Sequence, residues 1–115
     1  MRYTDDQRIK KIYEYAVQLK NYIIDNGLTK EELCKDIHLQ WLVTTPLYNI
    51  GEHAYYLSDS FKKEHDTIEW DLISGLRHRL VHNYDGINWS IISDVVFDEI
   101  PVLVDNLKQL IDRTV

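Results

Sequence analysis

The sequence predicts an all-α fold, an up-and-down bundle of four principal helices plus one short helix, in a single domain over residues 1–115. Only four Gly and two Pro occur in the chain, which leaves little turn chemistry for a multi-stranded sheet. Apolar residues recur at spacings of three and four over long stretches, as they do on one face of a helix. Hydrophobic residues make up 44% and charged residues 28%, a balance typical of a globular domain.

Two helix starts are expected near the N-terminus. Thr4 or Asp5 caps a first helix, and the Asn-Gly pair at 26–27 ends it, since glycine commonly follows a helix C-terminus. The pair Thr29 and Glu32, three residues apart, is typical of a capping box. It predicts a short helix that ends near residue 36.

A third helix is expected over Leu39–Phe61, with a kink or a late start at Pro46 because proline removes a helical hydrogen bond. Residues 61–70 are polar and loop-like. Asp66 or Thr67 is then expected to cap a fourth helix that runs to about residue 82.

The last segment allows two interpretations. Its β-branched residues and the stretch NYDGIN would suit a hairpin. However, apolar residues from Trp89 to Leu110 keep helical spacing for six turns, so we expect a helix capped by Asn88 and bent near Pro101. The three tryptophans are first interpreted as packing residues: Trp41, Trp70 and Trp89.

Charge and cysteine content exclude several classes of protein. The net charge of −6 argues against a protein that coats nucleic acid, although a local basic site remains open. Cys34 is the single cysteine, so neither an intrachain disulfide nor a thiol-rich metal site is expected. The N-terminus lacks the apolar core of a signal peptide, and no apolar run approaches the ~20 residues that cross a bilayer. We therefore expect a cytoplasmic protein without membrane contact.

The segment Trp70–Tyr84 carries the most suggestive chemistry. Arg77 is a permanent cation that can grip two phosphate oxygens, and His82 can exchange protons near neutral pH. Tyr84 adds a hydroxyl before a turn. Five residues rotate a helix by about 140°, so Arg77 and His82 do not share one face of a straight helix. From the spacing alone, a surface arginine and a helix-terminal histidine remain the simpler interpretation.

Other polar and aromatic residues also allow both a structural and a functional interpretation. His78 and His82 have a spacing that can chelate a metal, but Arg79 stands where a zinc protease needs glutamate, so no metal or cofactor is expected. Glu52 is either a solvated residue or the partner that orients Arg77. The aromatic residues Tyr48 and Tyr55 are expected in the core or at an interface.

Several landmarks, in order and at the expected separations, resemble HepT-like proteins of the HEPN superfamily. The resemblance covers the helix layout of the whole chain and is more specific from residue 50 onward. Its landmarks are Ile50-Gly51-Glu52, Trp70, Leu76-Arg77, His82-x-Tyr84 and Ile100-Pro101.

The resemblance implies a function. Arg77 and His82 would match the ribonuclease motif of the superfamily, with Tyr84 completing its HepT form and His78 replacing the usual Asn or Asp. Family members are homodimeric toxins of type VII-like toxin–antitoxin pairs that cut RNA in a cleft at the dimer interface. Their partner is an MNT-type nucleotidyltransferase antitoxin, which adenylylates the tyrosine that corresponds to Tyr84.

Three hypotheses follow. In the first, the chain is a homodimeric HepT-like RNase in which His82 carries protons, Arg77 stabilises the scissile phosphate, and His78 and Glu52 assist. In the second, it is a catalytically silent HEPN module that binds a nucleotidyltransferase. In the third, it is a helical interaction domain in which the motif serves only packing.

Overall fold

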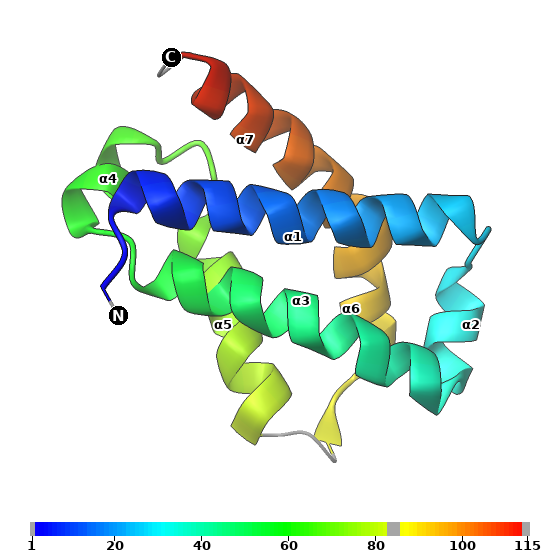
Figure 1. Ribbon diagram of the computed structural model, residues 1–115. Coiled ribbons are helices and arrows are strands. Elements are labelled where there is room, and N and C mark those ends of the chain that lie inside the picture. Colours follow the sequence, from blue (N-terminus) through cyan, green and yellow to red (C-terminus); the bar gives the residue numbers. More distant parts are fainter. Residues whose placement is uncertain (1, 83–85, 114–115) are drawn as a thin grey trace.

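The computed structural model describes residues 2–82 and 86–113, and the side chains of all of these except Val81, His82 and Arg113. Every regular element in these residues is helical, so the predicted all-α class is confirmed (Figure 1). The elements are α1 (Asp5–Asp25), α2 (Lys30–Lys35), α3 (Ile37–Tyr55), α4 (Asp59–Glu64), α5 (Trp70–His82), α6 (Trp89–Asp94), a π-helical turn η2 (Val95–Glu99) and α7 (Ile100–Arg113).

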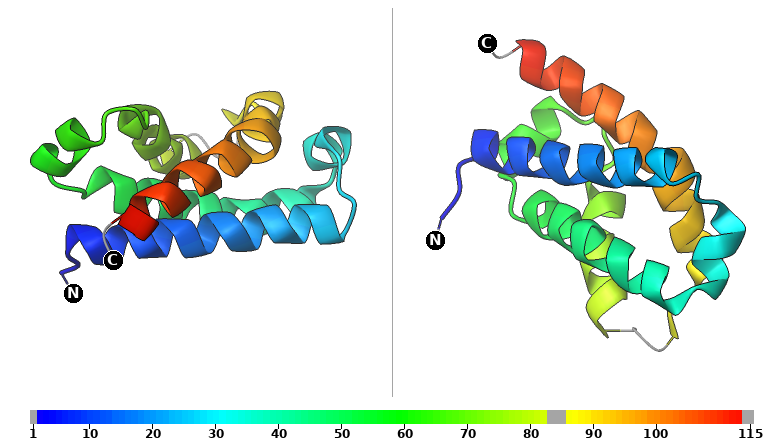
Figure 2. Two further views of the ribbon diagram at one scale, coloured as in Figure 1. Left: turned by 90° about the horizontal axis from the view of Figure 1, so that it is seen from above. Right: turned by 45° about the vertical axis from the view of Figure 1, so that its right-hand side comes forward.

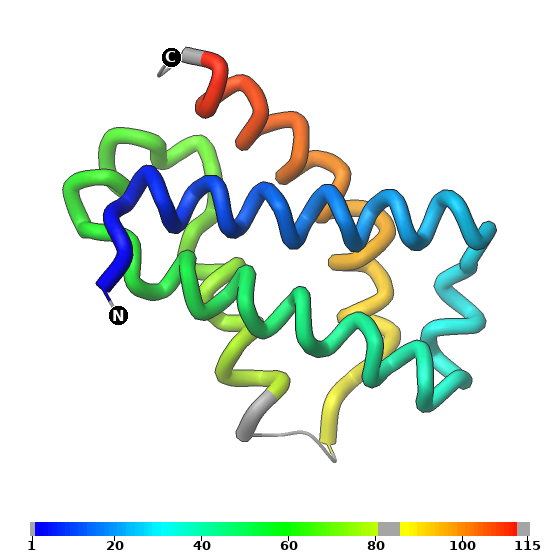
Figure 3. The backbone as a smooth tube through the Cα atoms, in the orientation of Figure 1, coloured from blue at the N-terminus to red at the C-terminus, as the bar shows by residue number. Residues whose placement is uncertain are grey.

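The four principal helices pack around one apolar core. Helices α1 and α3 run antiparallel side by side, and α5 crosses α3 on the face away from α1 (Figures 1 and 2). Helix α7 packs against α1 and completes the bundle. The tube in Figure 3 shows the chain reversing direction through α2, between the end of α1 and the start of α3. No helix of the described residues is both long and apolar enough to span a bilayer.

The first two helices begin and end where their local signals predict. The Thr4 hydroxyl accepts a hydrogen bond from the Gln7 backbone N–H at 3.1 Å, and the Thr4 backbone N–H donates one to the Gln7 side-chain oxygen at 2.9 Å, forming a capping box. Gly27, with φ of +58°, follows the end of α1 in a conformation that glycine adopts without strain. Thr29 and Glu32 form the second capping box as expected.

The boundary between the third and fourth helices differs from the prediction. Helix α3 continues through Pro46 but ends at Tyr55 instead of Phe61. The Ser58 hydroxyl caps a second short helix, α4, in a segment that was expected to be partly loop, and Ser58 also donates two hydrogen bonds to Asp5 of α1. This long-range anchor favours a new helix start over continuation of α3.

Helix α5 begins at Trp70, two or three residues later than the cap at Asp66 or Thr67 predicted. The Trp70 ring is buried, and its indole N–H donates to the His65 carbonyl at 3.0 Å. Residues 65–69 therefore form the turn that this bond closes. Of the tryptophans, Trp70 and Trp89 pack against the core, but Trp41 is 52% exposed, so its interpretation as a packing residue is wrong.

The C-terminal segment is helical from Trp89 onward, as its periodicity predicts. Asn88 caps it by accepting from the backbone N–H groups of Ser90 and Ile91. The π-helical turn η2 ends at Glu99, two residues before Pro101, where the path changes direction between α6 and α7 (Figure 1). The bend that was expected near Pro101 is therefore confirmed, and both the π-helical turn and the proline's missing N–H account for it.

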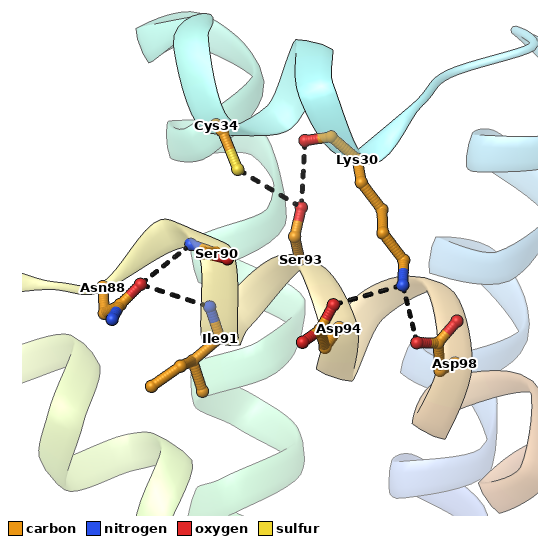
Figure 4. Close-up of polar contacts among 8 residues, drawn as sticks. All are labelled: Lys30, Cys34, Asn88, Ser90, Ile91, Ser93, Asp94 and Asp98. Atoms are coloured by element: carbon orange, nitrogen blue, oxygen red, sulfur yellow. Dashed lines mark hydrogen bonds and ion pairs between the residues drawn. The ribbon is translucent and has the colours of Figure 1, made fainter.

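Polar contacts hold α2 against α6. The Ser93 hydroxyl, which is buried, donates to the Lys30 carbonyl at 3.0 Å, and the Lys30 ammonium pairs with Asp94 and Asp98 at 3.1 and 2.6 Å (Figure 4). Cys34 contributes a weak contact to the same hydroxyl. The bond to the Lys30 carbonyl satisfies the buried Ser93 hydroxyl, which would otherwise be costly to bury, whereas the ion pairs of Lys30 lie at the exposed surface.

Gly51 determines how closely α3 and α5 approach. A Cβ atom at this position would lie 2.8 Å from the Arg77 backbone nitrogen and 3.1 Å from the Ile73 carbonyl oxygen. Only a residue without a side chain fits, so the two helix backbones are in direct contact here.

We expect Gly51→Ala to lower the free energy of unfolding in urea by up to about 2 kcal/mol. Overpacking costs about 1–3 kcal/mol, and because the added Cβ meets backbone atoms, we expect this cost to exceed the ~1 kcal/mol that alanine gains over glycine inside a helix. Gly75→Ala is the matched control, because a Cβ there would meet no heavy atom of the described residues within 4 Å. It should stabilise the protein by up to ~1 kcal/mol, and an equal gain at both positions would contradict the close approach.

Candidate functional site

Arg77 lies on the face of α5 that packs against α3. Its Nη1 donates to Glu52 Oε1 at 2.7 Å, and both side chains are half-buried, at 29% and 28% exposure. The pair that the sequence suggested between these residues is therefore present. The ion pair occupies one of the five N–H donors of the guanidinium, so it orients the group without exhausting its binding capacity.

A tyrosine one turn before Glu52 holds the other carboxylate oxygen. The Tyr48 hydroxyl donates to Glu52 Oε2 at 2.6 Å. This hydrogen bond, together with the charge of Arg77, lowers the pKa of Glu52, and the same bond raises the pKa of Tyr48. Glu52 is therefore a carboxylate at neutral pH, with both oxygens engaged.

Two tyrosines at the end of α3 cover the guanidinium. The Cζ atom of Arg77 lies 3.9 Å from the centroid of the Tyr55 ring and 5.7 Å from that of Tyr56. A polar contact with Tyr56, followed by the bond with Glu52, raises the pKa of Arg77. Arg77 is thus a fixed cation held by a carboxylate at its edge and an aromatic ring at its face.

Sequence reasoning missed the part these tyrosines play. Tyr48 and Tyr55 were expected as core or interface aromatics, yet Tyr48 is bonded to Glu52 and Tyr55 stacks on Arg77. Their spacing from Glu52, four residues before it and three after it, places all three on one helix face. That spacing could have indicated a shared role around Arg77.

The remaining predicted residues lie on α5 or beyond it. His78 is exposed on α5, next to Arg77 in the chain. His82 is the last residue of the helix, about 7.5 Å along the axis from Arg77 for five residues. The side chain of His82 and the whole of Tyr84 lie outside the described residues, so their geometry toward Arg77 stays a prediction.

Two other features of the described residues bear on where the site lies. The described residues contain no group of three or more His, Cys, Asp or Glu side chains arranged to hold a metal ion. An apolar groove of about 350 Å³ lies between α5 and the helices from α6 to α7. Its lining includes Arg79 but none of the predicted site residues, so the candidate site is the Arg77 cluster and not this groove.

The family and the known proteins that this chain resembles all carry ribonuclease names. The family described as "Ribonuclease HepT-like" matches residues 7–110. A protein of Caldanaerobacter subterraneus subsp. tengcongensis named "Putative RNase" is 30% identical over 102 residues, covering 87% of this chain and 91% of the relative. One of the same name in Methanocaldococcus jannaschii is 31% identical, covering 87% and 84%. "Probable ribonuclease HepT" of Thermococcus cleftensis is 29% identical, covering 70% and 73%. No solved structure matches significantly.

The lowered pKa of Glu52 leads to a prediction about stability. A carboxyl group whose pKa falls on folding stabilises the protein above its unfolded pKa, and this contribution disappears as the pH drops through the folded pKa. Glu52→Gln should therefore lower the free energy of unfolding at neutral pH. Its difference from the wild type should shrink below about pH 4.

Urea titrations across this pH range measure the effect. Glu14→Gln is the control, because Glu14 forms an exposed ion pair with Lys11 at 3.7 Å and should change stability by less than ~1 kcal/mol throughout. A gap between wild type and Glu52→Gln that stays constant with pH would contradict the prediction.

Proposed function

The chain belongs to the ribonuclease HepT-like family, and from this we propose that it is a metal-independent endoribonuclease with Arg77 and His82 as its catalytic residues. The observation that carries the proposal is the fixed orientation of Arg77, held by Glu52 and stacked on Tyr55. Catalytic electrostatics depends on charges that are already in place before the reaction, and Arg77 meets this condition.

The proposed chemistry needs a phosphate-binding cation and proton carriers. The ribose 2′-oxygen attacks phosphorus and loses its proton to an imidazole, while the bond from phosphorus to the 5′-oxygen breaks and that oxygen gains a proton. His82 performs one of these transfers, since its ordinary pKa lies close to neutral pH. Arg77 holds the non-bridging oxygens as their charge increases in the transition state. His78 and Glu52 assist, Glu52 by orienting Arg77.

Both proton transfers require a carrier, and one chain supplies one His82. We therefore propose that the active form is a homodimer, because two-fold symmetry would bring a second copy of each group to the same cleft. Both steps would then have an imidazole, with RNA bound at the interface between the two subunits.

The proposal extends to regulation. As a toxin of a toxin–antitoxin pair, the chain would be silenced by an MNT-type nucleotidyltransferase that adenylylates Tyr84. Tyr84 follows His82 by two residues, so the added AMP would bring negative charge close to Arg77. A covalently attached phosphate competes with the RNA phosphate for the same cation, which explains how modification would inhibit cleavage.

A catalytically silent module that binds a nucleotidyltransferase is the second candidate. The net charge of −6 favours it, because an acidic chain repels RNA outside the local cationic site. The third interpretation, that the motif serves only packing, is less well supported. Arg77 pairs with a carboxylate and keeps 29% exposure instead of being buried among apolar side chains.

The decisive experiment compares wild type with His82→Ala, expressed without a partner. We expect the wild type to arrest growth and cut bulk tRNA or mRNA, and the variant to cut RNA at least about a hundredfold more slowly, the typical contribution of a general acid–base group. His38→Ala, an exposed histidine at the start of α3, is the matched control and should behave as wild type. Intact RNA and equal growth with all three proteins would favour the silent module.

Adenylylation requires a separate variant. Tyr84→Phe removes the acceptor hydroxyl, so the variant should still cut RNA but should no longer be silenced when the nucleotidyltransferase is co-expressed. Intact-mass measurement should show added AMP on the wild type and none on Tyr84→Phe. Silencing of both proteins alike would contradict Tyr84 as the regulatory site.

A further inference from the structure

The aromatic cluster around Arg77 continues across the bundle to a second arginine. Arg8 of α1 places its Cζ atom 5.2 Å from the centroid of the Tyr56 ring and 5.3 Å from that of Tyr3. Tyr56 is thus shared by two guanidinium groups, since Arg77 lies 5.7 Å from the same ring. The start of α1 and the end of α3 lie at the same end of the bundle (Figure 1), which brings these residues together.

The two arginines are held by different kinds of partner. Arg77 pairs with the carboxylate of Glu52, whereas Arg8 Nη1 lies 3.2 Å from Nδ1 of His53. Burial, followed by the charges of Arg8 and Lys11, lowers the pKa of His53. A neutral imidazole can accept the hydrogen bond of Arg8 without cancelling its charge. Among the described residues no carboxylate forms an ion pair with Arg8, so this guanidinium keeps its full positive charge.

The surface beside Arg8 is aromatic and exposed. As whole residues, Tyr55 and Tyr56 are 49% and 55% exposed, and their rings pack edge to face with centroids 5.0 Å apart. Lys62 adds a further cation by donating to the Tyr55 carbonyl at 3.1 Å. Cations interleaved with exposed aromatic rings are the combination that binds single-stranded nucleic acid, whose phosphates and unstacked bases need both.

We propose that Arg8, Tyr55 and Tyr56 form a binding subsite for the single-stranded RNA that flanks the scissile phosphate. Arg8 holds a phosphate of the flanking nucleotides, and a base packs against the exposed tyrosine surface. The shared contact with Tyr56 keeps this subsite close to Arg77, so one short stretch of RNA reaches both. The subsite rests on the proposed function for its relation to cleavage, but its binding of RNA can be measured without cleavage.

The test uses full-length protein carrying His82→Ala, so that the RNA stays intact. Fluorescence anisotropy with a labelled single-stranded RNA of mixed sequence measures the Kd. Adding Tyr56→Ala should raise the Kd about tenfold, the scale of one lost base–aromatic contact. Adding Arg8→Gln should also lower the slope of log affinity against log salt by about 0.7, the value for one phosphate contact on a single strand.

Matched controls separate binding from folding. Trp41→Ala removes an exposed aromatic residue at the opposite end of α3, and Lys10→Gln removes an exposed cation from α1 close to Arg8 in the chain. Both should leave the Kd and the salt slope unchanged. Circular dichroism melts of all variants identify any that fail to fold, and Tyr56→Phe, which keeps the ring, should bind as tightly as its parent.

The outcomes distinguish this subsite from the nuclease itself. If the protein with intact His82 cuts RNA but the Arg8 and Tyr56 variants bind and cut as their parents do, the subsite is overturned and the nuclease stands. If binding depends on Arg8 and Tyr56 while no RNA is cut, the subsite stands and the nuclease fails. Absence of RNA binding, or equal losses in the Trp41 and Lys10 controls, overturns the subsite.

Discussion

The contact between α3 and α5 at Gly51 is the constraint on which the site depends. With no side chain at this position, the Arg77 backbone lies directly against α3. Glu52, the next residue of α3, can then reach the guanidinium at 2.7 Å, and Tyr55 covers its face one turn later. A larger residue at 51 would push the helices apart and separate all of these groups. The close packing of α3 against α5 therefore also determines the orientation of Arg77.

Local sequence predicted the helices well where local signals decide. The capping boxes at Thr4 and Thr29 and the bend near Pro101 are of this kind. The predicted end of α3 and the predicted start of α5 were wrong because long-range contacts decide these boundaries. Ser58 is anchored to Asp5 of another helix, and the buried Trp70 fixes the turn before α5. Apolar periodicity does not carry such information.

The same distinction applies to the site. The pair of Arg77 and Glu52 could be suggested from residue types, since a half-buried cation needs a partner. The stacking of Tyr55, and the continuation through Tyr56 to Arg8, depend on the register of three helices. No motif along the chain predicts how these three helices are placed relative to one another. A single sequence therefore indicated the charged residues of the site but not the aromatic surface that joins them.

The pairing of Arg77 with a carboxylate suits catalysis better than tight substrate binding. A cation that is partly neutralised by Glu52 attracts a ground-state phosphodiester only weakly, and it responds more to the additional charge of the transition state. Affinity for RNA must then come from groups away from the scissile phosphate. Arg8, whose charge a neutral His53 leaves intact, is such a group. In such an enzyme, contacts with the flanking nucleotides position the scissile phosphate. Arg77 then stabilises the transition state in which the bond from phosphorus to the 5′-oxygen breaks.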